Sequence, residues 1–527
     1  MRPAALRRGL VAFALGLCSL ATATAAFALT EAQSRGKQIY LTGESASGSD
    51  VSALVGTEGV ALPASAAPCA NCHGPDGLGR PEGGLLPPDI RWSQLTKIYG
   101  HVHENGRRHP KFDAQKVAHV LRTGLDPAGN QLDRGMPMYQ MSDEDMSDLI
   151  AYLKYLENDR DPGLADDSVQ VATLLPLRGS HGRLGQAMAQ VMLGHFKDIN
   201  DGGGIYGRRI ELLAIPFEAT REATLDSLRK ALRVEGVFAL VGAYTIGLDD
   251  QVLEVLRTEQ VPLVGPFTLD PGDQLENDAV FYLYSGFDEQ ARVLVDHALE
   301  GPGARPDSVL VIGPEGARSN RLVKAISDQV AKRKGKSPQV LRYETGTFDA
   351  AAVAAQVRDR ATQSVIFVGG QAGMDAMLAG LDGIGVYPRM YFLSSFVAKP
   401  PFEAPAGFNG QLFVAFPTMA RDIDEQGRAA YAQLAQRHGL PPDHVQAQMG
   451  AYAAAKLLEE GMRRAGSKLD RRALVEGIEA LYAFKTGVTP PLTYGPNRRI
   501  GALGAHVVTV DLIKRSYEPV GGWRELR

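Results

Sequence analysis

A short motif of cysteine and histidine near the front of the chain constrains the fold most. Cys69 and Cys72 stand three residues apart, and His73 directly follows the second cysteine, in the stretch APCANCHGPDGLG. The sequence has one other cysteine, Cys18, and it lies in an N-terminal segment of the signal type. Without Cys18 the chain has no disulfide framework to fold around, so the remaining pair is expected to serve a different chemistry.

The spacing is that of covalent c-type haem attachment. In a C-x-x-C-H motif the two thiols bond to the haem vinyl groups and the adjacent imidazole binds the iron. A zinc site would need four ligands, usually with a second pair of cysteines or histidines at short spacing, and a thioredoxin-like pair would need a βαβ setting. The surrounding sequence offers neither. We therefore predict one covalent haem c bound through Cys69, Cys72 and His73.

The first 28 residues have the layout of a secretory signal peptide. Arg2, Arg7 and Arg8 precede an apolar run over residues 10–20, and small residues lead to a cleavage site near Ala28. The run is shorter than the roughly twenty apolar residues of a membrane-spanning helix. We therefore expect an exported, periplasmic protein that begins near residue 29.

Composition and pattern divide the rest of the 527 residues into two parts. Residues 29–158 hold the haem motif and five of the eleven histidines, residues 159–167 form a polar linker, and residues 168–527 alternate apolar strands with amphipathic helices, as in βαβ proteins. A net charge of -4 provides no broad positive field for nucleic acid. We expect a small all-α domain followed by a larger α/β part.

The helix pattern of the first part is clearest at its end. Ser142 is a predicted N-cap, acidic residues follow in the first turn, and apolar residues recur at helical spacing at 146, 149, 150, 153 and 156. Two further helices are predicted in EAQSRGKQIYL and in DAQKVAHVLRTG, the second ending at Gly124.

Together with RGKQIY, CANCHGPDGLG and MPMYQMSDEDMSDLIAYLKYL, this part resembles class I cytochromes c. The resemblance implies that the second axial ligand is a methionine in a Met-Pro turn before the last helix, which is Met136 here. A thioether ligand favours ferrous iron, as suits an electron carrier. Met138 and Met141 are competing candidates, and Met146 is expected to fill the core.

The stretch HVHENGRRH offers His101, His103 and His109 as other ligands. We interpret these three histidines as residues of a solvated basic loop. A second interpretation is that they dock an acidic redox partner.

Residues 168–527 resemble the type I periplasmic binding proteins of the branched-chain amino acid group. The resemblance is carried by VATLLPLRGSHGRLGQAM, DINDGGGIYGRRIELL, FALVGAYTIG, VPLVGPFT, FNGQLFVAFP and AYAAAKLLEEGMRRAG. It implies two α/β lobes that close on a ligand like a hinge, joined by three crossovers, which we place near Ser285, Phe416 and Gly487.

The same resemblance implies a solute pocket made of loops at the ends of strands. The candidates are Ser180, His181, Leu184, Tyr244, Thr245, Thr268, Arg318, Gln371, Ser394 and Phe396. Amino acid binders of this group place an acidic residue for the ligand ammonium close to the position of Phe396, and no acid is near it here. An uncharged or anionic, partly apolar ligand suits the candidates better. Asp249 and Asp250 are other possible partners of a cation, and we expect them within the following helix.

The sequence predicts an exported c-type cytochrome that carries one electron and recognises a small solute in a hinged cleft. No arrangement of a nucleophile, a general base or a nucleotide-binding loop is visible, so we do not expect an enzyme. The expected partners are a small solute and a redox protein, either a dehydrogenase or an oxidase. Two alternatives stay open: an ABC transporter solute-binding protein, delivering to a permease, with an accessory haem, and a haem-based sensor.

Overall fold

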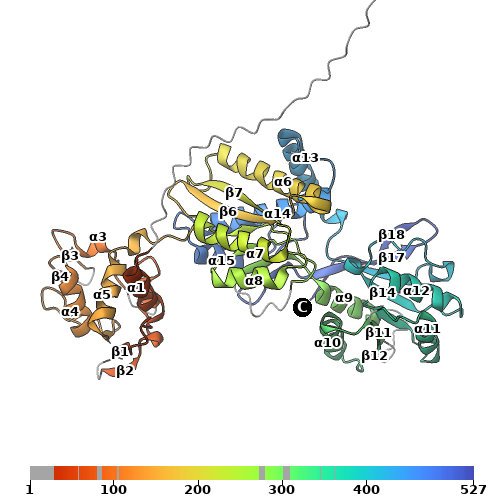
Figure 1. Cartoon of the computed structure of the whole chain (residues 1–527), viewed down its shortest axis with the longest axis horizontal. Helices are drawn as coiled ribbons and strands as arrows, with labels where there is room; N and C mark the ends of the chain where they lie inside the picture. The colour runs from red at the N-terminus through yellow and green to blue at the C-terminus, as the bar shows by residue number, and fades with distance from the viewer. Residues whose placement is uncertain are drawn as a thin grey trace, which may run out of the picture. The chain divides into compact units, whose positions relative to one another are not determined.

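Two compact units make up the chain in the computed structural model, which describes residues 29–56, 59–79, 86–103, 106–271, 279–300, 309–344, 346–360 and 362–526. One unit ends at Asp159 and the other begins at Arg160 (Figure 1). The predicted signal peptide, residues 1–28, lies outside the described residues. No described helix combines the length and apolar character needed to cross a membrane.

The first unit is built on two helices that cross at a glycine. Helix α1 (Glu31–Thr42) starts with a capping box between Thr30 and Gln33, and helix α5 (Asp143–Leu153) starts at the N-cap Ser142, as its sequence predicts. The two helices approach so closely at Gly36 that a Cβ there would lie 1.9 Å from the carbonyl oxygen of Asp148. The apolar stripe of α5 is buried in the core of this unit.

Shorter elements complete the first unit. Helix α4 (Ala114–Thr123) ends at Gly124, which has a left-handed conformation, as predicted. The other helices are α2 (Cys69–His73) and α3 (Trp92–Leu95). The unit also contains short antiparallel strands that the sequence did not indicate: β2 (Val60–Pro63), β1 (Ser52–Val55) and β5 (Met138–Gln140) form one sheet, and β3 (His101–Val102) and β4 (Arg108–His109) form a hairpin.

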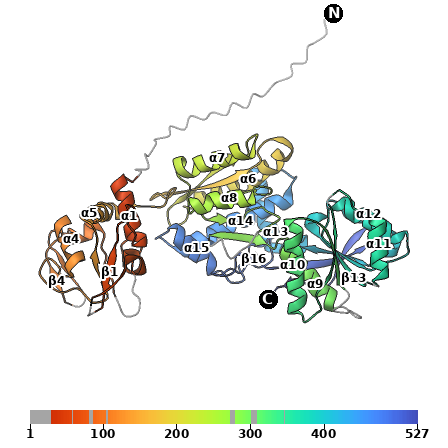
Figure 2. The ribbon, with the colours of Figure 1, turned by 60° about the horizontal axis from the view of Figure 1, so that its bottom comes forward.

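The second unit contains two α/β lobes, and the first is a parallel sheet with helices on both faces (Figures 1 and 2). The strand order is β16-β10-β9-β8-β6-β7. The strands are β6 (Ser168–Leu175), β7 (Arg209–Pro216), β8 (Leu240–Val241), β9 (Leu263–Val264), β10 (Val280–Tyr284) and β16 (Ile500–Ala502). The helices are α6 (Gly182–Asp201), α7 (Arg221–Lys230), α8 (Asp249–Thr258), α13 (Glu425–His438), α14 (Val445–Ala465) and α15 (Arg471–Glu479). One face buries apolar residues of α6 and α14, and the other buries residues of α7 and α8.

The second lobe has the sheet order β12-β11-β13-β14-β15-β17-β18, with β19 also paired to β17. The strands are β11 (Val309–Pro314), β12 (Gln339–Tyr343), β13 (Ser364–Phe367), β14 (Arg389–Leu393), β15 (Leu412–Phe416), β17 (Gly504–Asp511), β18 (Ser516–Pro519) and β19 (Arg524–Glu525). Helices α9 (Phe287–Glu300) and α10 (Ala317–Lys332) pack on one face, and α11 (Ala350–Asp359) and α12 (Gln371–Asp382) pack on the other.

The chain passes between the two lobes after β10, after β15 and between β16 and β17. The third passage is at Leu503, so the prediction of a crossover near Gly487 was wrong. Gly487 stays on the first lobe, where its carbonyl accepts a hydrogen bond from Asp424 N, just before α13. After Gly487 the chain first adds β16 to the sheet of the first lobe, so it crosses over only after that strand.

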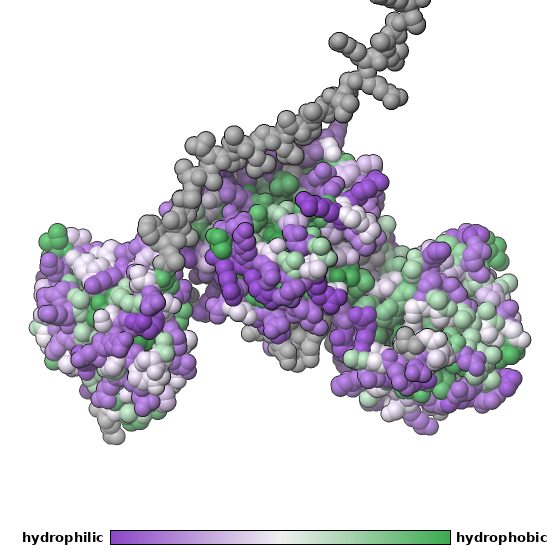
Figure 3. All heavy atoms as spheres, viewed as in Figure 1, coloured by the Kyte–Doolittle hydropathy of each residue, from purple (hydrophilic) through white to green (hydrophobic). Residues whose placement is uncertain are grey.

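Figure 3 shows hydrophilic side chains spread over the visible face of both units, with apolar residues scattered between them. Strongly exposed apolar side chains do occur, among them Ile98 and Tyr99 in the first unit and Tyr482 and Ile513 in the second. Scattered apolar side chains of this kind are common on soluble proteins and do not by themselves indicate an interface.

Candidate functional site

Helix α2 places the two cysteines and the histidine of the motif on one side. Cys69, Cys72 and His73 occupy positions i, i+3 and i+4 of the helix, which share a face. Both thiols are free; Cys69 is partly buried and Cys72 is exposed. Burial raises the pKa of the Cys69 thiol to about 12. The helix therefore presents two free thiols next to one imidazole.

The imidazole of His73 is held in the form that a metal ligand requires. The residue is only 4% exposed, and its Nδ1 lies 3.1 Å from the carbonyl oxygen of Pro88. A proton on Nδ1 donated to this carbonyl leaves a lone pair on Nε2. Burial also lowers the pKa of His73, which keeps the ring neutral. The end of the helix is fixed from the other side by Tyr40, whose hydroxyl donates to Gly74 O at 2.6 Å.

This donor set fits a covalent haem. A flat macrocycle bonded to both thiols needs them on one helix face with the ligating imidazole beside them, and α2 provides that arrangement. Within the described residues, the Nε2 atom of His73 has no hydrogen bond to the protein, so it is available as a ligand.

The methionine candidates lie in the segment that leads into α5. Met136 follows a turn closed by its amide and Asp133 O, and both Met136 and Met141 pack against the edge of the core. Met138 lies in β5, and Met146 is 3% exposed inside the core, where a filling role was expected. Met146 is thus the most deeply buried of the four methionines. The assignment of Met136 as the second iron ligand remains a prediction.

The three histidines of HVHENGRRH are packed together, which differs from the solvated loop expected from the sequence. His101 and His109 lie in paired strands β3 and β4, and His103 Nε2 lies 3.0 Å from His109 Nε2 and 2.8 Å from Arg107 Nη2. Burial and the nearby Arg107 charge lower the pKa of His103 to about 4. His109 is 8% exposed and its ring meets Phe112 edge to face. The hairpin brings the rings together and buries His109, whereas His101 and His103 stay partly exposed, so the expectation of a solvated loop was wrong for His109.

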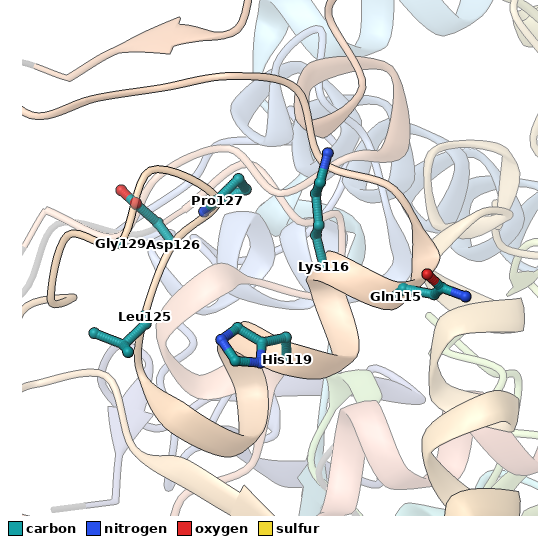
Figure 4. A pocket seen from close by; sticks show the side chains of 7 residues that line it. All are labelled: Gln115, Lys116, His119, Leu125, Asp126, Pro127 and Gly129. Atoms are coloured by element: carbon teal, nitrogen blue, oxygen red, sulfur yellow. The ribbon is translucent and has the colours of Figure 1, made fainter.

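No group of histidine, cysteine, aspartate and glutamate side chains in the described ranges has the geometry of a metal site. The same unit has a hollow of about 530 Å³ beside α4. Figure 4 shows Gln115, Lys116 and His119 arising from α4, and Leu125 and Asp126 from the turn that follows. The Asp126 carboxylate is already bonded to Arg107 at 2.7 Å, so it stabilises the turn.

A second cavity of about 520 Å³ lies between the lobes of the second unit. Leu184 and Met188 of α6 and Phe267 of the loop after β9 form its apolar wall, and Gln290 and Ser395 line it from the second lobe. Crossover residues and the start of α14 close it: Ser285, Pro417, Thr418, His444, Val445, Gln446 and Ala447. Among the residues that the structure describes, its lining contains no aspartate, glutamate, lysine or arginine.

Of the predicted pocket residues, Leu184 and Thr268 line this cavity. Others on the first lobe lie next to the lining residues. The ring of Tyr244 stacks on Phe267 with centroids 5.7 Å apart, and His181 lies 6.3 Å from Tyr244. Ser180 Oγ is 3.1 Å from His181 Nδ1. Ser180 therefore also lies near the stacked rings of Tyr244 and Phe267.

The predicted residues of the second lobe are more dispersed. Phe396 stacks on Phe287 at 4.7 Å, and the guanidinium of Arg318 lies 5.4 Å from the same Phe287 ring. Ser394 Oγ donates to the oxygen of Gln290 at 3.4 Å, which places it beside the cavity. Gln371, in contrast, accepts a hydrogen bond from Lys399 N at 3.1 Å and belongs to the local structure at the start of α12.

Asp249 is a half-buried acid next to the cavity. Thr245 and Thr268 each donate a hydroxyl hydrogen to its Oδ1 at 2.6 Å. Burial raises the pKa of Asp249. Asp249 and the exposed Asp250 begin α8, as expected for acids within that helix.

Several lining residues were missed from the sequence. Gln290 is 1% exposed and Ser285 is 4% exposed, and both lie where the chain first enters the second lobe. His444 precedes α14 with a positive φ of 54°. Ser285 and Gln290 come shortly after β10, so the first crossover, which the sequence analysis placed near Ser285, was the available signal for both.

Two family comparisons cover most of the chain. Residues 58–157 match the cytochrome c family, and residues 168–512 match the periplasmic binding protein family. The Leu/Ile/Val-binding protein homolog 3 of Brucella melitensis is 25% identical over 348 residues, covering 62% of this chain and 87% of that protein.

Solved structures share the fold of the second unit. A branched-chain amino acid ABC transporter protein of Thermus thermophilus with bound valine aligns with a TM-score of 0.51 and 15% identity, over 68% of this chain and 97% of that one. A fatty acid ABC transporter substrate-binding protein of Thermomonospora curvata has a TM-score of 0.51 and 14% identity, over 70% of this chain and 95% of that one. The two proteins are named for different ligands, valine and a fatty acid, so the shared fold does not identify the ligand of this cleft.

Proposed function

Because this chain belongs to the periplasmic binding protein family and also carries a cytochrome c domain, we propose that it is an exported one-electron carrier that recognises a small solute. A cytochrome c domain indicates covalently bound haem c. The single C-x-x-C-H motif supports one haem per chain. The proposed solute site is the cleft between the two lobes.

The observation that carries the proposal is the common face of α2. Cys69 and Cys72 would hold the haem covalently, and His73 would bind its iron through Nε2 while Pro88 O holds the ring orientation. When bound, the haem supplies a reversible one-electron change at iron. Met136 would supply the second iron ligand, a thioether that favours ferrous iron.

The second unit supports reversible solute capture. Its two lobes are linked by three passages of the chain, an arrangement in which a few crossover residues absorb a hinge motion. The cavity between the lobes has a volume within the usual range for small ligands, about 300–1,000 Å³. Closure of the cleft on its solute would alter the docking of the cytochrome domain to a dehydrogenase or an oxidase.

Spectroscopy of the purified full-length protein tests the electron-carrier role. We expect the ferric protein to show the methionine-to-iron charge-transfer band and Met136→Ala to lose it. Met138→Ala and Met141→Ala serve as matched controls and should keep the band. A wild-type spectrum without this band would favour an open iron site and a sensor role.

A second candidate function is delivery of the solute to an ABC permease, with the haem in an accessory role. It is favoured by the relatives, because the titles of both solved structures above name ABC transporters. Deletion of the gene distinguishes the two functions. A defect in uptake of the solute that depends on a permease supports delivery, whereas a defect in electron flow with normal uptake supports the electron carrier.

A further inference from the structure

The described residues that line the interlobe cavity include no aspartate, glutamate, lysine or arginine, and His444 is the one basic side chain among them. They combine apolar side chains such as Leu184, Met188 and Phe267 with hydroxyl and amide groups. The nearest predicted cation, Arg318, is already engaged, with Asp270 at 3.9 Å and the Phe287 ring at 5.4 Å. A charged ligand group in this cavity would lose hydration without gaining an opposite charge.

Three hydroxyl groups of the wall point their hydrogens into the protein. Thr268 donates to Asp249 Oδ1 at 2.6 Å, Ser285 donates to Ala502 O at 3.1 Å, and Thr418 donates to a carboxylate oxygen of Asp422 at 3.1 Å. Each hydroxyl has one hydrogen, so these three can only accept from a ligand.

Thr268 is the clearest acceptor of the three. Its oxygen already accepts one hydrogen bond from Asp270 N at 3.0 Å, which leaves a second lone pair for a ligand. The carboxylate of Asp249 behind it also repels an anion.

The start of α14 contributes donors on another part of the wall. The residues 445–447 line the cavity, and the first amides of a helix have no partner within the helix. The carboxylate of Asp443 lies beside this helix end, where it forms ion pairs with Arg183 and, at 3.9 Å, with His444. Its negative charge offsets the partial positive charge at the start of the helix. The ligand group that accepts hydrogen bonds from these amides can therefore be neutral, such as a hydroxyl or carbonyl oxygen.

We propose that this cleft takes an uncharged, mostly apolar molecule that donates a hydrogen bond, such as an alcohol or a primary amide, and rejects free amino acids and other carboxylates. The proposal rests on the solute-binding function proposed above and names the chemical class of its ligand. The ligand donates to Thr268, accepts from amides at the start of α14, and fills the apolar wall with its carbon chain.

Isothermal titration of the full-length protein with four matched probes tests this assignment. The probes are 1-hexanol, hexanoate, hexylammonium and L-leucine, which have similar carbon skeletons and differ in charge. We expect 1-hexanol to bind at least about tenfold more tightly than each charged probe. Equal or tighter binding of a charged probe overturns the inference and leaves the solute-binding function in place. Binding of none of the four overturns the inference and counts against the solute-binding function as well.

A pair of variants tests the orientation of the hydroxyls. Asp249→Ala removes the acceptor of the Thr245 and Thr268 hydrogens and frees them to donate to a ligand. We expect the preference for 1-hexanol over hexanoate to fall by about threefold to tenfold in this variant. Asp250→Ala, at the exposed neighbouring acid, should leave the preference unchanged. An unchanged preference in Asp249→Ala with wild-type folding by circular dichroism would refute the role assigned to Thr268.

Another pair locates the binding. Gly450 lines the cavity from α14, and a Cβ at this position would meet only Phe267 Cδ2, at 3.8 Å. Gly450→Leu should therefore fill the cavity and weaken 1-hexanol binding by tenfold or more, whereas Ala429→Leu, on the exposed side of α13, should not. Equal binding in both variants would show that the probe binds elsewhere and would overturn the assignment.

Discussion

The crossing of α1 and α5 at Gly36 allows a sharp test of how the haem unit is held together. Adding one methyl group in Gly36→Ala would place a Cβ 1.9 Å from the carbonyl oxygen of Asp148 and 2.9 Å from Tyr152 Cβ. Ordinary contacts lie at about 3.5 Å or more, so the two helices would have to separate by roughly 1.5 Å. The obstacle is backbone, which cannot move aside as a flexible side chain does.

The size of the effect follows from two opposed contributions. Overpacking a tight contact costs about 1–3 kcal/mol, occasionally more, whereas replacing glycine by alanine inside a helix gains about 0.5–1 kcal/mol. The first contribution is larger because the clash involves the helix backbone over a buried crossing. We expect Gly36→Ala to lower the unfolding free energy of the haem unit by about 1–2 kcal/mol, or its melting temperature by roughly 4–10 °C.

Thermal unfolding of the full-length protein, followed by haem absorbance for the first unit and by far-UV circular dichroism, measures this. Gly450→Ala in α14 is the matched control, because the same change there meets no atom closer than 3.8 Å. It should stabilise the second unit by about 0.5–1 kcal/mol. If the haem unit of the Gly36→Ala variant melts at or above the wild-type temperature, the conclusion that α1 and α5 approach closely at Gly36 is wrong.

Two further predictions concern buried charge and pH. Arg471 donates to four backbone carbonyls, those of residues 237, 238, 259 and 260. Arg471→Ala should therefore lower the unfolding free energy of the second unit by about 2–4 kcal/mol in urea unfolding. An unchanged urea midpoint would contradict this. Burial and Arg107 lower the pKa of His103 to about 4 from its usual 6.5, so the unfolded chain binds protons below pH 6.5 before the folded chain does. Stability of the haem unit should therefore fall as the pH drops from 6.5 towards 4, and less steeply in His103→Gln; equal slopes would count against a neutral His103.

The sequence predicted the elements whose signals are local. The N-cap Ser142, the apolar stripe of α5 and the left-handed Gly124 at the end of α4 all depend on residues within a few positions of one another. The C-x-x-C-H spacing belongs to the same class, because a single helix turn decides which side chains share a face.

Features that depend on contacts distant in the chain were not predictable. The short strand β5 pairs with β1, more than eighty residues earlier, and no alternating pattern marks either strand. The histidines of β3 and β4 were expected in a solvated loop, because their sequence is polar, and only the hairpin pairing brings the rings together. The third crossover at Leu503 was missed for the same reason, since β16 and β17 belong to different sheets.

The solute pocket shows where sequence reasoning ends. Thr268 was identified from the resemblance to periplasmic binding proteins, but the direction of its hydroxyl hydrogen depends on Asp249 and cannot be read from residue type. That direction decides whether the cleft donates to a carboxylate or accepts from a neutral ligand.

A potentiometric titration of the full-length protein with its absorption spectrum tests the central claim most directly. The account predicts a single one-electron transition of one haem, with the methionine-to-iron band present in the ferric wild type and lost in Met136→Ala but retained in Met138→Ala. Two transitions, or a wild-type spectrum of an iron with an open axial position, would contradict it.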